Sequence, residues 1–337
     1  MSSTKPFQSH NRGHSHLGSI VVAAVSILAA LLIFANRQQV IDQVTVWQYQ
    51  PSSQIAGLAS RSSMNSTGKF YFYASRPVVE DAQPFNQDCG RKEASTAILG
   101  CYNGQNIFIY NVTNTQLDGI KEVTAAHEML HAAYARMGSA EKKTIDALLE
   151  AEYDKLKANK DIAERFAFYA RTEPGERDNE LHSVIGTEIA SINPALEEHY
   201  KKYFTDRSKV VILHDKYASV FARLQAKSDA LSAKLTELGN QIEQETKDYN
   251  AAVVTLNADI NDFNRRANSG GFSSKSEFDS ERASLVARAA SLDASRQTIN
   301  DKIAQYNALR EELKSVASQS ETLNRSIDSS LSPAPSL

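Results

Sequence analysis

The sequence of 337 residues is poor in glycine and proline, with 14 and 8 respectively, and has no proline between Pro194 and Pro333. Because proline disrupts the interior of a helix, a proline-free stretch of this length is what long uninterrupted helices require. The charges nearly balance, with 40 acidic and 37 basic residues and a net charge of −3. This balance offers no positively charged surface, so we expect no nucleic-acid partner.

Only two cysteines are present, Cys89 and Cys101. A site in which both thiolates bind a metal would have a CxxC-like spacing, which is absent here. In an oxidising compartment, an even cysteine count among loop-forming residues predicts a disulfide instead. Closing a loop of about a dozen residues would add about 3 kcal/mol to the free energy of unfolding by restricting the unfolded chain. We therefore expect a Cys89–Cys101 disulfide in an exported protein.

Acidic residues are absent before Asp42, and residues 17–35 carry no charge of either sign. This apolar run approaches the ~20 residues that cross a bilayer as a helix. A cleaved signal peptide is the alternative, but its apolar core is usually about 7–15 residues long and ends at a small-residue site. We expect an uncleaved transmembrane anchor over residues 17–36. Since Lys5 and Arg12 precede the run, the positive-inside rule places residues 1–16 in the cytoplasm and the C-terminal part outside it, in a single-pass membrane protein.

Three segments rich in aromatic and β-branched residues predict strands at residues 69–74, 97–102 and 105–112. Asn103-Gly104 lies between the second and third segments and predicts a hairpin with a two-residue turn. Residues 37–65 are polar and predict a weakly structured juxtamembrane linker.

Residues 124–133 read Thr-Ala-Ala-His-Glu-Met-Leu-His-Ala-Ala and contain an HExxH motif in an alanine-rich segment. On a helix, His127 and His131 lie one turn apart on the same face, so both imidazoles could bind one Zn²⁺ at about 2.0–2.1 Å. Glu128 is rotated by roughly 100° and lies beside the metal, where a general base for a zinc-bound water is needed. A structural helix with two half-buried histidines is the alternative. Gly138 is expected to end this helix.

The motif, its uncharged flanks and the small sheet expected before it resemble the N-terminal half of a zincin metallopeptidase, over roughly residues 69–190. Metzincins continue with a glycine and a third histidine, but Tyr134 and Met137 occupy those positions here. The resemblance is therefore to gluzincins, which supply a glutamate from a later helix, often in an Asn-Glu step.

Two glutamates could provide this third zinc ligand. Glu180 completes an Asn-Glu step in the first turn of an expected helix and is the preferred ligand. Glu188 lies about 80° further round the same helix and is either the alternative ligand or a residue that supports Glu180 as the ligand without touching the metal. His182 projects roughly 200° from Glu180, so we expect it to lie away from the metal. Tyr169 and Arg171 have the chemistry to stabilise an oxyanion, although a surface role is the alternative.

From about residue 209 the apolar residues follow heptads, which predict a coiled coil. The first seam ends at Gly270-Gly271, and Ser274 with Glu277 predicts a capping box that begins a second helix. We therefore expect an antiparallel hairpin over residues 206–330 and a disordered tail over 331–337. The a positions are Phe221, Ser228, Leu235, Ile242, Tyr249, Leu256 and Phe263, and the second helix repeats at Phe278, Leu285, Leu292, Ile299, Tyr306, Leu313 and Ile327.

The expected fold class is α+β, with a small zincin-like domain over residues 66–205, a short β-sheet and helices, an N-terminal transmembrane helix and the C-terminal hairpin. The resemblance implies a membrane-anchored, extracytoplasmic zinc metallopeptidase that hydrolyses peptide bonds by Glu128-assisted attack of a zinc-bound water. Its partners would be a peptide or protein substrate, the membrane, and a protein bound by the hairpin. The alternatives are a non-catalytic envelope adaptor with structural zinc and a partner-binding coiled coil, or a cell-wall peptide or amide hydrolase. Glu128 argues against the adaptor, since a structural zinc site needs no base.

Overall fold

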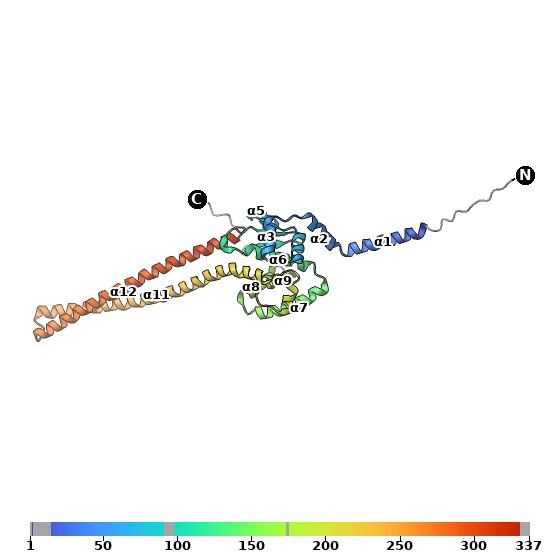
Figure 1. The fold of residues 1–337 in the computed structure, drawn as a ribbon. Coiled ribbons are helices and arrows are strands. Elements are labelled where there is room, and N and C mark those ends of the chain that lie inside the picture. The colour runs from blue at the N-terminus through green and yellow to red at the C-terminus, as the bar shows by residue number, and fades with distance from the viewer. Residues whose placement is uncertain (1, 3–14, 91–97, 173–174, 331–337) are drawn as a thin grey trace. The chain divides into compact units, whose positions relative to one another are not determined.

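The structure, a computed structural model, describes residues 2, 15–90, 98–172 and 175–330. It is mostly helical with one small sheet, which agrees with the α+β class in its coarse form (Figure 1). The chain forms two compact units, one of Met1–Lys216 with Ile327–Leu337 and the other of Tyr217–Ser326. The expected tail over 331–337, and nearly all of that over 1–16, lies outside the described residues.

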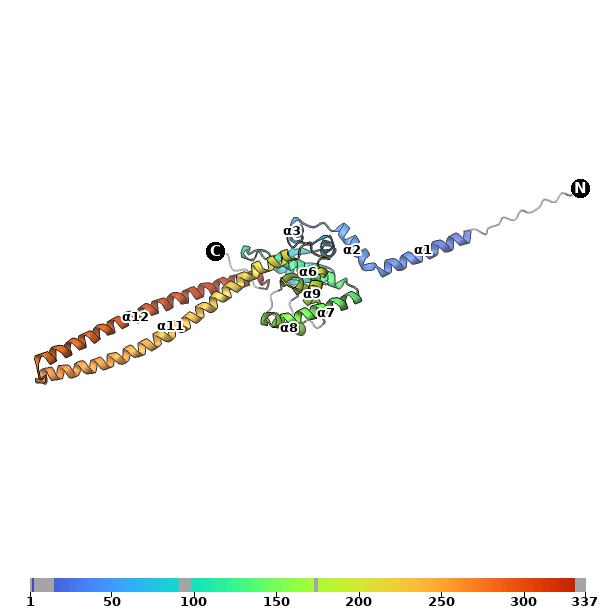
Figure 2. The ribbon, with the colours of Figure 1, turned by 60° about the horizontal axis from the view of Figure 1, so that its bottom comes forward.

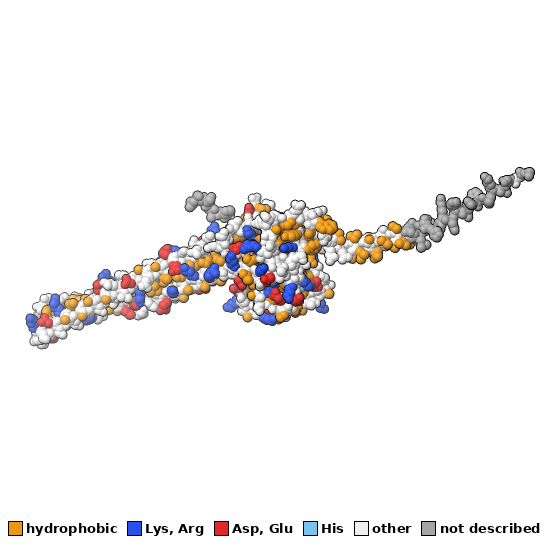
Figure 3. Space-filling view, in the orientation of Figure 1, with side chains coloured by type: hydrophobic (Ala, Val, Ile, Leu, Met, Phe, Trp, Pro, Cys, Tyr) orange, Lys and Arg blue, Asp and Glu red, His pale blue; other side chains and the backbone are white. Residues whose placement is uncertain are grey.

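Helix α1 (Ser15–Ala35) covers the apolar run. From Ile20 to Phe34 its large apolar side chains are exposed, and the space-filling view shows hydrophobic side chains along this helix (Figure 3). Within the described residues, no single helix is long and apolar enough to cross a membrane. Ile20–Ala35 and Arg37–Gln48 meet that criterion only as a pair, with a bend of 77° between them.

Residues 37–65 are largely helical, so our expectation of a weakly structured linker was wrong. Helix α2 (Arg37–Gln48) buries two polar residues, Asp42 and Thr45, and α3 (Ser53–Arg61) buries apolar ones. The Asp42 carboxylate accepts two hydrogen bonds from the Arg136 guanidinium, at 2.7 and 2.8 Å. The many polar residues of this segment suggested weak structure, but the contact between Asp42 and Arg136 holds α2 against the domain.

The aromatic segment 69–74 is also helical rather than a strand, and forms part of α4 (Ser66–Ala74). The Asn65 side chain caps this helix by accepting hydrogen bonds from the N–H groups of Thr67 and Gly68. Phe72 is fully buried. The N-cap and the packing of this side chain override the strand propensity of the aromatic residues.

The sheet has three short strands in the order β1-β3-β2. β1 (Val78–Glu80) is parallel to β3 (Ile107–Tyr110), and β2 (Gly100–Tyr102) is antiparallel to it. The expected hairpin is present, but four residues connect Tyr102 to Ile107 instead of two. The side chain of Asn103 accepts hydrogen bonds from two N–H groups within this connection, which stabilises the longer turn. The predicted first residue of β2, Ala97, lies outside the described residues.

The predicted disulfide between Cys89 and Cys101 is confirmed, with Cα atoms 5.9 Å apart. It connects the end of α5 (Ala82–Asp88) to β2. Both cysteines pack in an apolar cluster with Phe85 and Phe108. The covalent bond therefore joins the sheet to the segment before it.

Helices α6 (Ile120–Ala135) and α9 (Arg177–Glu188) pack closely against one another within the first unit. Gly186 of α9 permits this approach, because a Cβ there would lie 2.5 Å from Leu130 and 2.7 Å from the Tyr200 ring. α6 ends at Ala135, and Gly138 caps the start of α7 instead of ending α6. The remaining elements of this unit are η1 (Thr115–Leu117), α6 (Ile120–Ala135), α7 (Ser139–Leu156), α8 (Lys160–Thr172), α9 (Arg177–Glu188) and α10 (Pro194–Tyr200).

The expected antiparallel hairpin consists of α11 (Ser208–Ser269) and α12 (Lys275–Ile327), and all but the ends of these two helices makes up the second unit (Figure 2). Gly270 adopts a φ of 70° in the turn between them. Ser274 Oγ accepts a hydrogen bond from the Glu277 N–H, whereas the Glu277 carboxylate accepts from Ser273, one residue earlier than the capping box requires. Ion pairs between the helices include Lys227–Glu312 and Arg288–Asp259. The buried residues Leu256, Phe263, Leu285 and Ile299 fall on the predicted heptads.

We predict that Asp42→Ala lowers the free energy of unfolding of the full chain by about 3–5 kcal/mol, because it leaves the buried Arg136 guanidinium unpaired. Chemical denaturation followed by circular dichroism measures this change. The double variant Asp42→Leu/Arg136→Met should recover much of the loss, since no unpaired charge remains buried. Asp154→Ala, which removes an exposed ion pair with Lys157, is the control and should barely shift the midpoint. An equal effect of Asp42→Ala and Asp154→Ala would contradict the structural role of the buried pair.

Candidate metal centre

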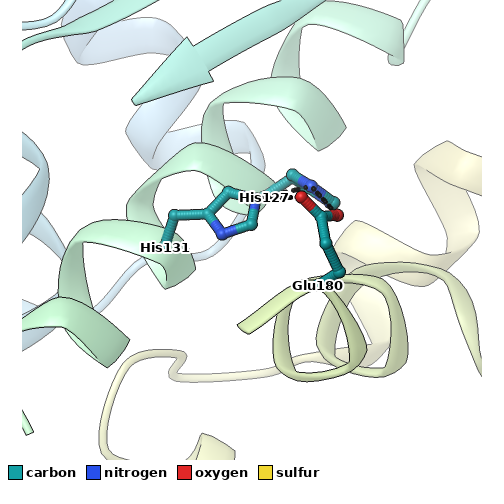
Figure 4. Close-up of side chains that lie close together, drawn as sticks. All are labelled: His127, His131 and Glu180. Atoms are coloured by element: carbon teal, nitrogen blue, oxygen red, sulfur yellow. Dashed lines mark hydrogen bonds and ion pairs between the residues drawn. The ribbon is translucent and has the colours of Figure 1, made fainter. Parts of the chain in front are cut away.

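The two motif histidines and Glu180 converge between α6 and α9 (Figure 4). His127 Nε2 and His131 Nε2 are 3.0 Å apart. The Glu180 carboxylate oxygens lie 3.7 Å from His127 Nε2 and 3.6 Å from His131 Nε2. One potential ligand atom of each residue falls within 4.8 Å of the other two. The structure thus brings together the three residues predicted as metal ligands.

α6 can run through the interior of the domain because its residues are small and apolar on most sides. Ala125, Ala126, Ala132 and Ala133 are almost completely buried. Thr124 satisfies its hydroxyl within the helix by donating to the carbonyl of Ile120 at 2.8 Å. The alanine-rich flanks of the motif therefore serve to bury this helix against its neighbours.

The orientation of His131 is set by Asn179, the other residue of the Asn-Glu step. Asn179 Oδ1 lies 2.9 Å from His131 Nδ1, and Asn179 Nδ2 donates to Glu176 at 2.9 Å. Because the amide nitrogen faces Glu176, the amide oxygen faces the imidazole and Nδ1 must carry the proton. His131 Nε2 then directs its lone pair toward Glu180 and His127. Sequence reasoning used Asn179 only to choose Glu180 and missed its contact with His131.

The ionisable groups in this cluster shift one another's pKa values. Burial alone would lower the pKa of His127, but the carboxylates of Glu180, Glu128 and Glu188 outweigh it and raise that pKa. Burial would raise the pKa of Glu180, but His127, His131 and a hydrogen bond from Tyr169 outweigh it and lower that pKa. The negative carboxylate and the imidazole lone pairs therefore favour a positive charge between them.

The donor set fits a divalent transition metal. A tetrahedral zinc site with bonds of about 2.0–2.1 Å separates its ligand atoms by roughly 3.3 Å, close to the separations found here. Glu180 Oε2 is buried and has no hydrogen-bond partner among the described residues. A metal ion between the three side chains would provide this oxygen with a partner. Two imidazoles and one carboxylate suit zinc and related transition metals better than calcium or magnesium.

The candidate base, Glu128, lies in a buried position beside the cluster and raises the pKa of His127. It packs against the first residue of β2, Gly100. A Cβ at Gly100 would lie 2.8 Å from Glu128 Oε1 and 2.6 Å from Thr124 Cγ2. The absence of a side chain at this position therefore lets the edge of the sheet lie directly on Glu128. Sequence reasoning placed Gly100 in a strand but had no signal for this contact.

Glu188 is not part of the three-residue cluster. Arg165 donates a hydrogen bond of 2.6 Å to its carboxylate, and His214 lies 3.4 Å from the same oxygen. Burial would raise its pKa, but His214 and Arg165 outweigh it and lower the pKa of Glu188 to about 2. Glu188 is thus held by the Arg165 guanidinium and the His214 imidazole, and its charge also raises the pKa of His127.

The two residues considered for stabilising an oxyanion, Tyr169 and Arg171, lie in different environments. Burial and the nearby Glu180 carboxylate raise the pKa of Tyr169, whose hydroxyl therefore keeps its proton and contributes a hydrogen bond to Glu180. Arg171 is exposed and donates to the Ala167 carbonyl of its own helix. Only Tyr169 lies at the candidate site.

His182 lies away from the metal ligands, as its helical position predicts. It is fully buried, and its Nε2 is 3.0 Å from His199 Nε2. Burial, followed by the neighbouring His199, holds the pKa of His182 well below its usual value. This histidine is packed in its neutral form among the side chains of Tyr134, Tyr200 and Tyr203.

Comparisons with protein families, curated proteins and solved structures find no significant match to this chain. The functional interpretation therefore rests on the geometry of these residues and on the resemblance of the motif.

We predict that the purified full chain binds about one Zn²⁺, since three ligands converge on one point. Elemental analysis after dialysis measures the stoichiometry. His131→Ala should abolish binding, whereas Glu128→Gln should retain the metal because Glu128 is not in the ligand cluster. Loss of the metal from Glu128→Gln would show that the roles are assigned incorrectly.

We also predict that the two glutamates of α9 contribute unequally to zinc affinity. Glu180→Ala should weaken binding by more than about 100-fold, because it removes a ligand, and Glu188→Ala by less than about tenfold. Competition with a chromogenic chelator measures both affinities. Both variants remove a largely buried carboxylate from the same helix. Each therefore controls for a loss of zinc affinity that comes only from a less stable fold. Equal losses would exclude Glu180 as the specific third ligand.

Proposed function

We propose that this protein is a zinc-dependent metallopeptidase anchored at the extracytoplasmic face of a membrane. The observation that carries the proposal is the convergence of His127, His131 and Glu180 with the Glu128 carboxylate beside them. Catalytic zinc sites use three protein ligands and keep a further position for water or substrate, whereas structural sites are closed by four. His127 exposes 18% of its side chain, so the cluster can be reached from solvent.

Zinc would supply Lewis acidity that makes a water molecule acidic and polarises the substrate carbonyl. The chain's own groups then handle the protons. The Glu128 carboxylate removes a proton from the attacking water while the water oxygen forms a bond to the carbonyl carbon of the substrate. Glu128 next delivers that proton to the amide nitrogen as the C–N bond breaks, which leaves a carboxylic acid and an amine.

Tyr169 and Asn179 assist through their contacts with two of the ligand residues. The raised pKa of Tyr169 keeps its hydroxyl protonated, so the hydroxyl can move its hydrogen bond from Glu180 to negative charge that develops on the substrate oxygen. Asn179 holds the His131 ring in the tautomer whose Nε2 faces the metal position. Both residues keep the reacting groups in a fixed arrangement.

An extended peptide is the substrate class that suits this site. β2 pairs with β3 on one side and, within the described part of the chain, has no strand on the other. A peptide could add to this edge through main-chain hydrogen bonds. Because Gly100 of β2 lies against Glu128, a peptide paired there would pass beside the base. This placement favours peptide hydrolysis over the adaptor role.

Several features support anchoring and export. Ile20–Ala35 is apolar on all sides and exposed, which is typical of a helix inside a membrane or a large core. Lys5 and Arg12 precede it, and the first acidic residue, Asp42, follows it. The Cys89–Cys101 disulfide suits an oxidising compartment outside the cytoplasm. The hairpin of α11 and α12 then provides a long surface on which a protein partner could bind.

We predict that Glu128→Gln lowers kcat/KM for peptide hydrolysis by about 10²–10⁴-fold while zinc stays bound, because only the base is lost. A library of quenched fluorescent peptides, assayed with the full chain in detergent, provides the substrate and the rate.

Gly100→Ala tests the contact between the sheet and the base. It should also lower the rate with zinc retained, because the added Cβ displaces Glu128. Gly57→Ala is the matched control, since a Cβ there meets no atom within 4 Å and the rate should not change. Undiminished hydrolysis by Glu128→Gln would exclude the proposed mechanism.

A further inference from the structure

Helix α2 presents four large apolar side chains outward, and the two residues that it buries are polar. Asp42 and Thr45 are buried, whereas Val40, Ile41, Val44 and Trp47 are exposed. The four apolar residues recur at helical intervals of three and four and so lie on one face, which we call the α2 apolar face. Trp47 exposes 75% of its surface. A helix of a water-surrounded domain has the opposite arrangement.

This orientation is held firmly. The Arg136 guanidinium donates two hydrogen bonds to the buried Asp42 carboxylate and further ones to the Ala132 carbonyl and the Tyr102 hydroxyl. At the end of the helix, the Tyr49 hydroxyl donates to the Pro77 carbonyl at 2.6 Å. Rotation of α2 to bury its apolar face would break the Asp42–Arg136 pair, so the face stays exposed to whatever surrounds the protein.

The chemistry of this face matches the boundary between lipid headgroups and acyl chains. Tryptophan is enriched at that boundary, and aliphatic side chains insert beneath it. Arg37 begins the helix, where a cation can meet lipid phosphate, and the one acidic residue of α2, Asp42, points to the protein. Only Asn36 separates α2 from α1, and the two helices are bent by 77°. A spanning helix followed by such a bend would place α2 along the membrane surface.

We propose that the α2 apolar face is a lipid-binding surface that lies in the membrane interface and fixes the orientation of the domain on the bilayer. This inference rests on the proposed anchor, α1. Arg136 is the C-cap residue of α6, the helix that carries His127 and His131. The pair of Asp42 and Arg136 therefore connects the lipid-facing helix α2 to α6, the helix that carries the two histidines. The domain would present that centre at a constant height and angle above the membrane.

Trp47 is the only tryptophan in the chain, so its fluorescence reports on this face without a label. The experiment reconstitutes the full chain in vesicles of phosphatidylcholine and phosphatidylglycerol, with bromine on the acyl chains either near the headgroup or near the methyl end. An interfacial helix buries its apolar face by about 5–10 Å, so headgroup-proximal bromine should quench Trp47 roughly twofold or more, and distal bromine less. The emission should be shifted to the blue relative to the chain unfolded in denaturant.

Val44→Asp places a charge in the middle of the face and should abolish the quenching, while the protein still floats with the vesicles through α1. Ile212→Asp is the matched control, because Ile212 is also an exposed aliphatic residue, 63% accessible on α11, and quenching should persist. Circular dichroism establishes that both variants are folded.

The failures of the two proposals are distinguishable. Loss of the unmodified chain from the vesicles on flotation would overturn the anchor. Flotation without quenching of Trp47 by either lipid would overturn the role of α2. Blue-shifted emission that brominated lipid does not quench would mean that a second copy of the chain covers the face, which also overturns the proposal.

Discussion

The close packing of α9 on α6 determines whether the protein has a metal centre at all. His127 and His131 come from one helix and Glu180 from the other, so the distance between the helices sets the distance between the ligands. That distance is short because Gly186 leaves room for the side chains of Leu130 and Tyr200. The third ligand is far from the motif in sequence, yet this single contact brings it within reach of both histidines.

The same packing buries a negative charge that a cation would neutralise. A buried carboxylate costs free energy unless it is paired, and Glu180 has one oxygen without a hydrogen-bond partner among the described residues. The imidazole nitrogens that face it are oriented by Asn179 and by the helix. Metal binding would therefore stabilise the contact between α6 and α9 as well as provide the chemistry. Glu188 differs because its carboxylate already forms an ion pair with Arg165, at 2.6 Å, and lies 3.4 Å from His214.

The sequence predicts the parts that depend on local pattern. Helical spacing identifies His127 and His131, the Asn-Glu step identifies Glu180, and heptads with a Gly-Gly turn identify the hairpin of α11 and α12. Long-range contacts decide the parts that were mispredicted or missed. The aromatic segment 69–74 folds as part of α4 because the Asn65 side chain caps the helix and Phe72 packs in the core. Residues 37–65 are largely helical, partly because the Asp42–Arg136 pair holds α2 against the domain. The role of Gly100 is likewise invisible without its neighbour, Glu128.

The central claim is that one metal ion lies between α6 and α9, coordinated by two imidazoles and a carboxylate. X-ray absorption at the zinc edge of the full chain tests it most directly, because it reports the ligand atoms themselves. We predict nitrogen and oxygen scatterers at about 2.0–2.1 Å, with the outer-shell pattern of two imidazoles, and loss of this signal in His127→Ala because the metal no longer binds. Scattering from sulfur at about 2.3 Å, or a spectrum unchanged by His127→Ala, would place the zinc elsewhere and contradict the account.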